Sequence, residues 1–225
     1  EADRGISVMT SVMTFNYGGC VFNLLDTPGH EDFSEDTYRT LSAVDSAVMV
    51  IDAAKGIEAR TQKLFEVCRL RDIPIITFIN KMDREGRDPF ELLQEIEQTL
   101  ALDTAPINWP VGRGRSFAGV YDLASNRVRQ LDADPDGFIV DGPDDERGSA
   151  LLDVPEKDEL LEELMLAKEA CLPFDLDAFN EGHLSPVLFG SALRDFGVRD
   201  LIDTLAEIAP PPQPQKADVR VVQPD

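Results

Sequence analysis

The 225-residue sequence has little cysteine and no long apolar run, and each shortage excludes a class of protein. Its three cysteines lie far apart and form no C-x-x-C pair, so we expect neither a zinc site nor a disulfide framework. No apolar run approaches the roughly 20 residues that a helix needs to cross a bilayer. The opening EADRG also lacks the basic and apolar stretches of a signal peptide. We therefore expect a cytoplasmic protein without membrane contact.

Positive charge is also scarce. Lys and Arg number 21 against 43 Asp and Glu, which gives a net charge of −22. Such an excess of negative charge repels a phosphate backbone, so we expect no direct DNA binding, and any RNA contact must come from local patches or from other regions. An alternative explanation for most of these charges is solubility alone.

The apolar residues that are present, 43% of the chain, suffice for one core and a small satellite domain. Apolar runs at 47–53, 74–80 and 186–190 are separated by segments with helical periodicity. Because parallel strands need long crossovers, the pattern predicts an α/β fold with a mostly parallel sheet and helices on both faces. Residues 8–26 predict a hairpin with a Gly-Gly turn. Helices are expected over 31–44, near Leu64 to Arg71, after the cap Asp88 and Pro89 as far as Leu100, and over 197–208.

The pattern divides the chain into three parts. Residues 1–110 and 184–209 form the main α/β domain. Residues 111–183 change to short strand-like pieces and one helix, which predicts a small α+β inserted subdomain that leans on the main sheet. Residues 210–225 begin with a proline tract and are expected to link to a following domain.

Asp26-Thr27-Pro28-Gly29-His30 follows an apolar strand that we expect to be buried. At the carboxyl end of such a strand, a carboxylate can hold Mg²⁺ through water and a glycine lets a backbone N–H approach a phosphate closely. Taken alone, the D-x-x-G pattern also fits an ordinary turn.

A second motif, Asn80-Lys81-Met82-Asp83, also follows an apolar strand. The Asp83 carboxylate can accept hydrogen bonds from N1–H and the 2-amino group of guanine, while the Lys81 stem lies along the ring and Asn80 ties neighbouring loops together. Ser191-Ala192-Leu193 follows a third strand and can present a backbone N–H to the guanine carbonyl. Type, order and strand position together favour a guanine-nucleotide site.

The sequence as a whole resembles the translational GTPases. The similarity lies in RGISV at 4–8, DTPGHEDFSEDTYRTLSAVDSAVMVIDAAKG at 26–56 and INWPVGRG at 107–114. The tract EDFSEDTYRTL and Ser7 are most similar to the branch that acts in translation termination, because elongation factors G and Tu usually carry Thr at the Ser7 position. The resemblance implies a P-loop NTPase-like GTPase domain.

The resemblance also implies a role for each motif residue. Ser7 orders a switch segment around Mg²⁺ and the terminal phosphate, and Asp26 holds Mg²⁺ through water. The turn Thr27-Pro28-Gly29 contacts that phosphate, and His30 positions the attacking water by orientation and charge stabilisation. The nucleotide base is read by Asn80, Lys81, Met82 and Asp83, supported by Ser191, Ala192 and Leu193. His183 is expected to be structural.

By this resemblance the protein hydrolyses GTP to GDP on the ribosome and recycles class I release factors after peptide release. Two alternatives stay open: a translocase or ribosome-protection GTPase similar to elongation factor G, and a non-hydrolysing protein interaction module. No G-x-x-x-x-G-K-[ST] phosphate-binding loop occurs in the sequence. The family carries this loop before the position of residue 1, so we expect the sequence to be a fragment that by itself has no measurable GTP affinity at micromolar nucleotide.

Overall fold

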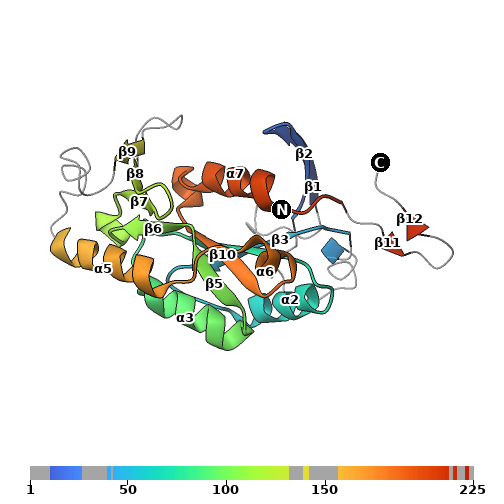
Figure 1. Ribbon diagram of the computed structural model, residues 1–225, viewed down its shortest axis with the longest axis horizontal. Coiled ribbons are helices and arrows are strands. Elements are labelled where there is room, and N and C mark those ends of the chain that lie inside the picture. Colours follow the sequence, from blue (N-terminus) through green and yellow to red (C-terminus); the bar gives the residue numbers. More distant parts are fainter. Residues whose placement is uncertain are drawn as a thin grey trace, which may run out of the picture.

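The computed structural model describes residues 11–26, 40–41, 43–131, 139–141, 157–212, 215–216 and 221–222. Its centre is a four-stranded sheet in the order β3-β4-β10-β5, with every neighbouring pair parallel (Figure 1). These strands are β3 (Ala47–Asp52), β4 (Ile75–Asn80), β10 (Leu184–Phe189) and β5 (Asp103–Pro106). The predicted α/β class and parallel sheet are confirmed.

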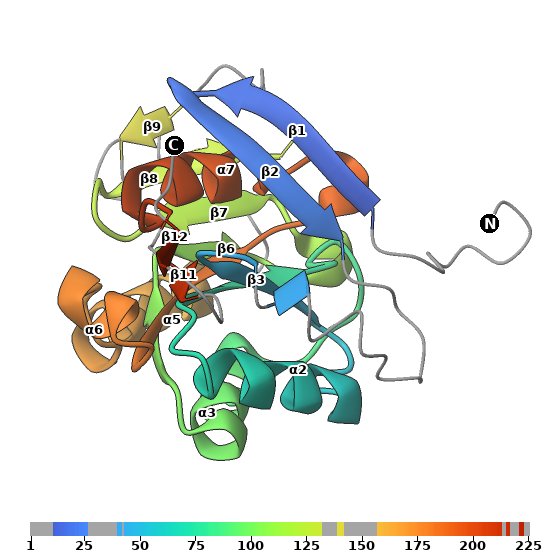
Figure 2. The ribbon, with the colours of Figure 1, turned by 90° about the vertical axis from the view of Figure 1, so that its right-hand side faces the viewer.

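Helices cover both faces of this sheet (Figure 2). Alternate residues of β4 point to opposite faces, because side chains in a strand alternate. Ile75 and Ile79 belong to the core shared with α2 (Ala59–Arg69) and α3 (Pro89–Leu100). Ile76 and Phe78 instead pack in a second cluster with α7 (Val198–Ile208). The unbroken apolar run of β4 is therefore explained by burial on two sides.

The start of α3 is set by its own sequence. Asp88 Oδ1 accepts hydrogen bonds from the backbone N–H groups of Phe90 at 2.9 Å and Glu91 at 3.3 Å, so the predicted cap is confirmed. Pro89 stands at the first helical position. The helix ends where Ala101 adopts a left-handed conformation. By contrast, α2 ends at Arg69, so the prediction that Arg71 belongs to this helix is wrong, and Arg71 is exposed.

Strands β1 (Ser11–Tyr17) and β2 (Cys20–Asp26) form the predicted hairpin. The turn residues Gly18 and Gly19 have φ of +56° and +79°, which glycine adopts without strain. The prediction that Asp26 ends a buried strand of the main sheet is wrong. Within the described residues β2 pairs with β1 alone, and Asp26 is exposed. Apolar composition buries a strand only where other elements cover it.

A second, antiparallel sheet has the order β6-β7-β8-β9 and carries helix α5 (Lys157–Ala170). Its strands are β6 (Asn108–Val111), β7 (Gly119–Asp122), β8 (Arg127–Gln130) and β9 (Ile139–Asp141). The sequence indicated neither β8 nor β6. The β8 segment RVRQ is mostly polar, with Val128 as its buried residue, and β6 contains a proline. This sheet begins at Asn108, before residue 111, while the domain boundaries stay predictions.

The second sheet is fixed to the first by β6. Asn108 Oδ1 accepts from the backbone N–H of Phe189 at 2.7 Å, and Asn108 Nδ2 donates to its carbonyl at 3.3 Å. Trp109 is fully buried and packs against Phe90 of α3 and Phe189 of β10. On α5 the apolar side chains of Leu160, Leu164 and Ala167 are buried in the same core. The two sheets therefore share one apolar core.

The remaining described elements are short. They are the 3-10 turns η1 (Gly114–Ser116) and η2 (Ala192–Arg194), helix α6 (Leu176–Asn180), and the strand pair β11 (Gln215–Lys216) and β12 (Val221–Val222). Of the helix predicted over 31–44, only Thr40 and Leu41 are described as helical, and most of that segment lies outside the described residues. Within the described part of the chain, every helix is too short or too polar to span a bilayer.

Candidate functional site

Three parallel strands end at one edge of the main sheet. Asp52 ends β3 beside Asn80 at the end of β4, and Ile79 of β4 pairs with Phe189 at the end of β10. The loops that follow these strands therefore meet at the carboxyl edge, where open α/β sheets bind their ligands. The 80–83 and 191–193 motifs from the sequence both lie in these loops.

Asn80 links the neighbouring loops. Its Oδ1 accepts from the backbone N–H of Lys81 at 2.8 Å and from that of Ala192 at 2.9 Å. Its backbone carbonyl accepts from the N–H of Ala53 at 3.0 Å. One residue thus joins the loops that follow β3, β4 and β10.

Lys81 is held in a left-handed conformation with φ +70°, which is uncommon for a residue with a side chain. Its Nζ lies 2.7 Å from Asp52 Oδ2, and the other carboxylate oxygen of Asp52 accepts from the Ala54 N–H at 2.9 Å. Burial by itself raises the pKa of Asp52, but the bonds from Lys81 and Ala54 outweigh it and lower that pKa below its usual value. Asp52 is therefore an anionic anchor for Lys81.

Asp83 is oriented by a residue far away in the sequence. Ser191 is fully buried, and its Oγ donates to Asp83 Oδ1 at 2.5 Å. Hydrogen bonds to a carboxylate are among the stronger ones in proteins, and this one fixes the carboxylate plane. The remaining lone pairs of the carboxylate stay available to a ligand that offers two donors.

Met82, between Lys81 and Asp83, is buried and is held through its backbone from two directions. Its N–H donates to the carbonyl of Gly190 at 3.1 Å, and its carbonyl accepts from the N–H of Gly114 at 2.9 Å. Met82 is therefore an anchor for the loop, and its buried side chain does not face a ligand.

The turn after β10 is closed by its own backbone. Ser191 N–H donates to the carbonyl of Phe196 at 2.9 Å, and Phe196 N–H donates to the carbonyl of Ser191 at 3.0 Å. The Ala192 N–H is already bonded to Asn80, whereas the Leu193 side chain is 73% exposed. Of the predicted turn residues, Ser191 is therefore buried, whereas Ala192 and Leu193 are exposed.

The phosphate side of the predicted site lies mostly outside the described residues. Ser7 and the segment 27–30, with Thr27, Pro28, Gly29 and His30, are not described, and their predicted roles stay predictions. Asp26 is described and offers an exposed carboxylate at the end of β2. An exposed carboxylate fits Mg²⁺, which usually keeps several waters and takes only one or two protein carboxylates.

Sequence reasoning missed two residues of this site. The first is Asp52, the partner of Lys81. It was overlooked, although it is an acidic residue at the end of an apolar strand, which was a usable signal. Gly114 lies in the 107–114 tract that carries the resemblance, but nothing in the sequence linked it to Met82, because their contact brings together segments that only the fold makes neighbours.

Comparison with known proteins identifies similar chains. The model of the elongation factor Tu GTP-binding domain family matches residues 1–211. Peptide chain release factor 3 of Symbiobacterium thermophilum is 54% identical over 230 residues, which cover 100% of this chain and 44% of that protein. The chain thus spans less than half the length of this curated relative. A crystal structure of a Thermus thermophilus protein matches with a TM-score of 0.69 and 24% identity, covering 91% of this chain and 32% of that one, which indicates a shared fold.

Proposed function

Because the chain belongs to the family of elongation factor Tu GTP-binding domains, we propose that it is the guanine-nucleotide domain of a GTPase that acts in translation termination. On this proposal the protein works in the cytoplasm, hydrolyses GTP to GDP on the ribosome, and promotes dissociation of class I release factors after peptide release. The similarity to a peptide chain release factor 3 supports this task above that of a translocase.

The observation that carries the proposal is the Asp83 carboxylate, oriented by Ser191 at the carboxyl edge of the sheet. A carboxylate in that position accepts hydrogen bonds from N1–H and the 2-amino group of guanine. Adenine lacks both donors, so it leaves the half-buried carboxylate without partners, at a cost in affinity. Lys81, tied to Asp52, offers its aliphatic stem to the face of the ring.

We assign the hydrolytic step to residues 26–30. Asp26 and Ser7 would hold Mg²⁺, and Gly29 would contact the terminal phosphate. Bound Mg²⁺ supplies charge neutralisation at the phosphates. His30 orients the attacking water, and segments ordered by the terminal phosphate relax after hydrolysis, which makes the domain a switch.

The proposal is tested on the intact protein, meaning this chain with any residues that precede Glu1 or follow Asp225. Ribosomes in a terminated state carry a fluorescent class I release factor, and its dissociation is followed by stopped flow with GTP or ATP. We expect faster dissociation with GTP only. Movement of tRNA by one codon would instead favour the translocase, and binding without hydrolysis would favour the interaction module.

The role of His30 is tested in the same assay by His30→Ala. Since misplacing a reacting group by about 1 Å can cost about 100-fold in rate, we expect ribosome-stimulated hydrolysis to fall by about that factor while GDP affinity stays near that of the wild type. His183→Ala, which changes the other histidine of the sequence, serves as the control. Unchanged hydrolysis by the His30 variant removes the catalytic assignment.

A further inference from the structure

The peptide bond between Met82 and Asp83 is held by a segment outside the main sheet. The Met82 carbonyl accepts from the N–H of Gly114, and this carbonyl belongs to the peptide group whose N–H is that of Asp83. The orientation of that peptide plane sets the direction in which the Asp83 side chain leaves the backbone. Any shift of Gly114 is therefore passed to the carboxylate that reads guanine.

Gly114 belongs to a tight turn that follows β6. Arg113 N–H donates to Ser116 Oγ at 3.3 Å, Ser116 Oγ donates to the Arg113 carbonyl at 2.9 Å, and Ser116 N–H donates to the same carbonyl at 3.1 Å. Gly112 has φ +73°, and a Cβ there would clash with the Ser116 carbonyl oxygen. These local bonds therefore close the turn on itself, with Arg113 at its centre.

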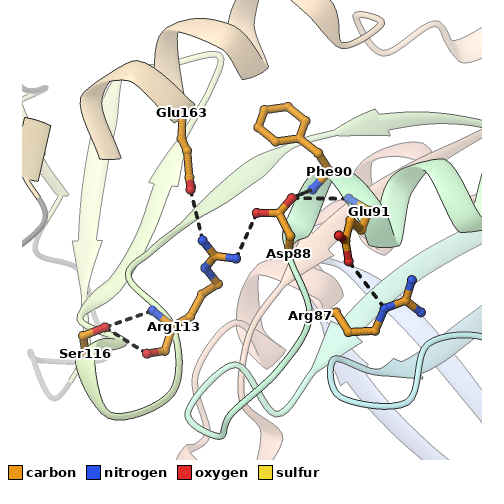
Figure 3. A network of polar contacts seen from close by, with 7 residues as sticks. All are labelled: Arg87, Asp88, Phe90, Glu91, Arg113, Ser116 and Glu163. Atoms are coloured by element: carbon orange, nitrogen blue, oxygen red, sulfur yellow. Dashed lines mark hydrogen bonds and ion pairs between the residues drawn. The ribbon is translucent and has the colours of Figure 1, made fainter. Parts of the chain in front are cut away.

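The Arg113 side chain connects this turn to two helices (Figure 3). Its Nη1 lies 2.9 Å from Asp88 Oδ2, the carboxylate that caps α3, and its Nη2 lies 3.1 Å from Glu163 Oε1 on α5. A hollow of about 260 Å³ lies between the turn and α5, lined by Gly112, Arg113 and Glu163 among others. The Arg113 guanidinium crosses this hollow between the two carboxylates.

We propose that Arg113 is a positioning residue for guanine recognition, which braces the 112–116 turn between the α3 cap and helix α5 and so keeps Gly114 on the Met82 carbonyl. This inference rests on the proposed function, because it concerns the same base-reading loop. It makes α5, a helix outside the main sheet, a determinant of nucleotide selectivity. A partner that displaces α5 then changes guanine affinity without touching the nucleotide.

The experiment compares GDP with inosine diphosphate, which lacks only the 2-amino group, in the intact protein. Dissociation constants are measured by competition with a fluorescent GDP for the wild type, Arg113→Ala, Arg113→Lys and Glu163→Gln. Arg87→Ala is the matched control. Arg87 is 35% exposed against 37% for Arg113 and also pairs with two carboxylates, but those belong to α3 alone.

For Arg113→Ala we expect GDP binding about tenfold weaker, which corresponds to about 1.4 kcal/mol, and a smaller ratio of GDP to inosine diphosphate affinity. The ratio falls because the bond to the 2-amino group depends on carboxylate alignment. Arg113→Lys keeps the charge but lacks the fork that spans two carboxylates, so its ratio should lie between those of wild type and alanine. Glu163→Gln shifts the ratio in the same direction.

A variant that merely loses stability should bind GDP and inosine diphosphate more weakly by the same factor, which leaves the ratio of the two affinities unchanged. Half-exposed ion pairs contribute little to stability, so Tm of the variants should fall by no more than about 4 °C. An unchanged ratio of GDP to inosine diphosphate affinity in Arg113→Ala overturns the inference. If the alanine variant does not fold, the same ratio is measured in Glu163→Gln, and an unchanged value there overturns the inference. A wild type that binds ADP as well as GDP refutes the proposed function and this inference together.

Discussion

Replacement of Ser191 by alanine tests how the structure builds the guanine site. The Ser191 hydroxyl is fully buried and donates to Asp83 Oδ1 at 2.5 Å, so alanine removes the bond that orients the carboxylate. A hydrogen bond to a charged group contributes about 1.5–3 kcal/mol. Asp83 is only half-buried, and water can replace part of this bond, so we take the lower part of that range. GDP affinity should therefore fall by about tenfold, since about 1.4 kcal/mol is a factor of ten.

The assay is calorimetric titration of the nucleotide-free intact protein with GDP. Ser125→Ala is the matched control, because the Ser125 hydroxyl also donates to an aspartate oxygen, Asp122 Oδ1 at 2.7 Å, but in the second sheet. We expect the control to bind GDP like the wild type. If Ser191→Ala also binds GDP within about twofold of the wild type, the hydrogen bond does not position Asp83 for the base, and the reasoning from this geometry fails.

Three further predictions follow from the same contacts. Asp83→Asn keeps one acceptor oxygen, which can still bind N1–H, and replaces the other by an NH2 donor that opposes the 2-amino group of guanine. The intact protein should therefore lose GTP binding and gain affinity for xanthosine triphosphate, whose 2-oxo group is an acceptor; competition binding measures both. The pKa of Asp52 is lower when folded than when unfolded, so its bond to Lys81 stabilises the protein at neutral pH and is lost in acid. The Tm difference between wild type and Asp52→Asn should be constant above about pH 5, begin to shrink as the pH falls below about 4, and disappear only below the lowered pKa of Asp52. Burial raises the pKa of the Cys68 thiol to about 11, so at about pH 8 an aromatic disulfide reagent should react with exposed Cys20 and reach Cys68 only after unfolding.

Much of the fold could be predicted because its signals are local. Asp88 and Pro89 define the start of α3 through a cap and a fixed backbone angle that depend on adjacent residues only. The turn at Gly18 and Gly19 defines the hairpin in the same way. The apolar runs of β4 and β10 indicated strands buried on two faces, and the structure pairs them side by side. Each of these signals is carried by residues close together in the sequence.

Other features could not be predicted because they depend on which elements cover a segment. The run Cys20–Asp26 looks as apolar as a core strand, yet its side chains are mostly exposed and it pairs with β1 alone among the described strands. Strand β8 is polar and gave no signal, since its one buried residue, Val128, meets the core through tertiary packing. Burial is a property of the neighbours of a strand as well as of its composition.

By itself the sequence determined the chemistry of the candidate site: the residue types at 80–83 and 191–193, their order, and their positions directly after strands. Only the tertiary structure decided how these groups are held. Ser191 bonds to Asp83 across 108 residues of sequence, and Gly114 reaches Met82 from beside a second sheet. Distances between segments far apart in the chain are set by packing of the whole core, so they cannot be predicted from residue patterns within one segment.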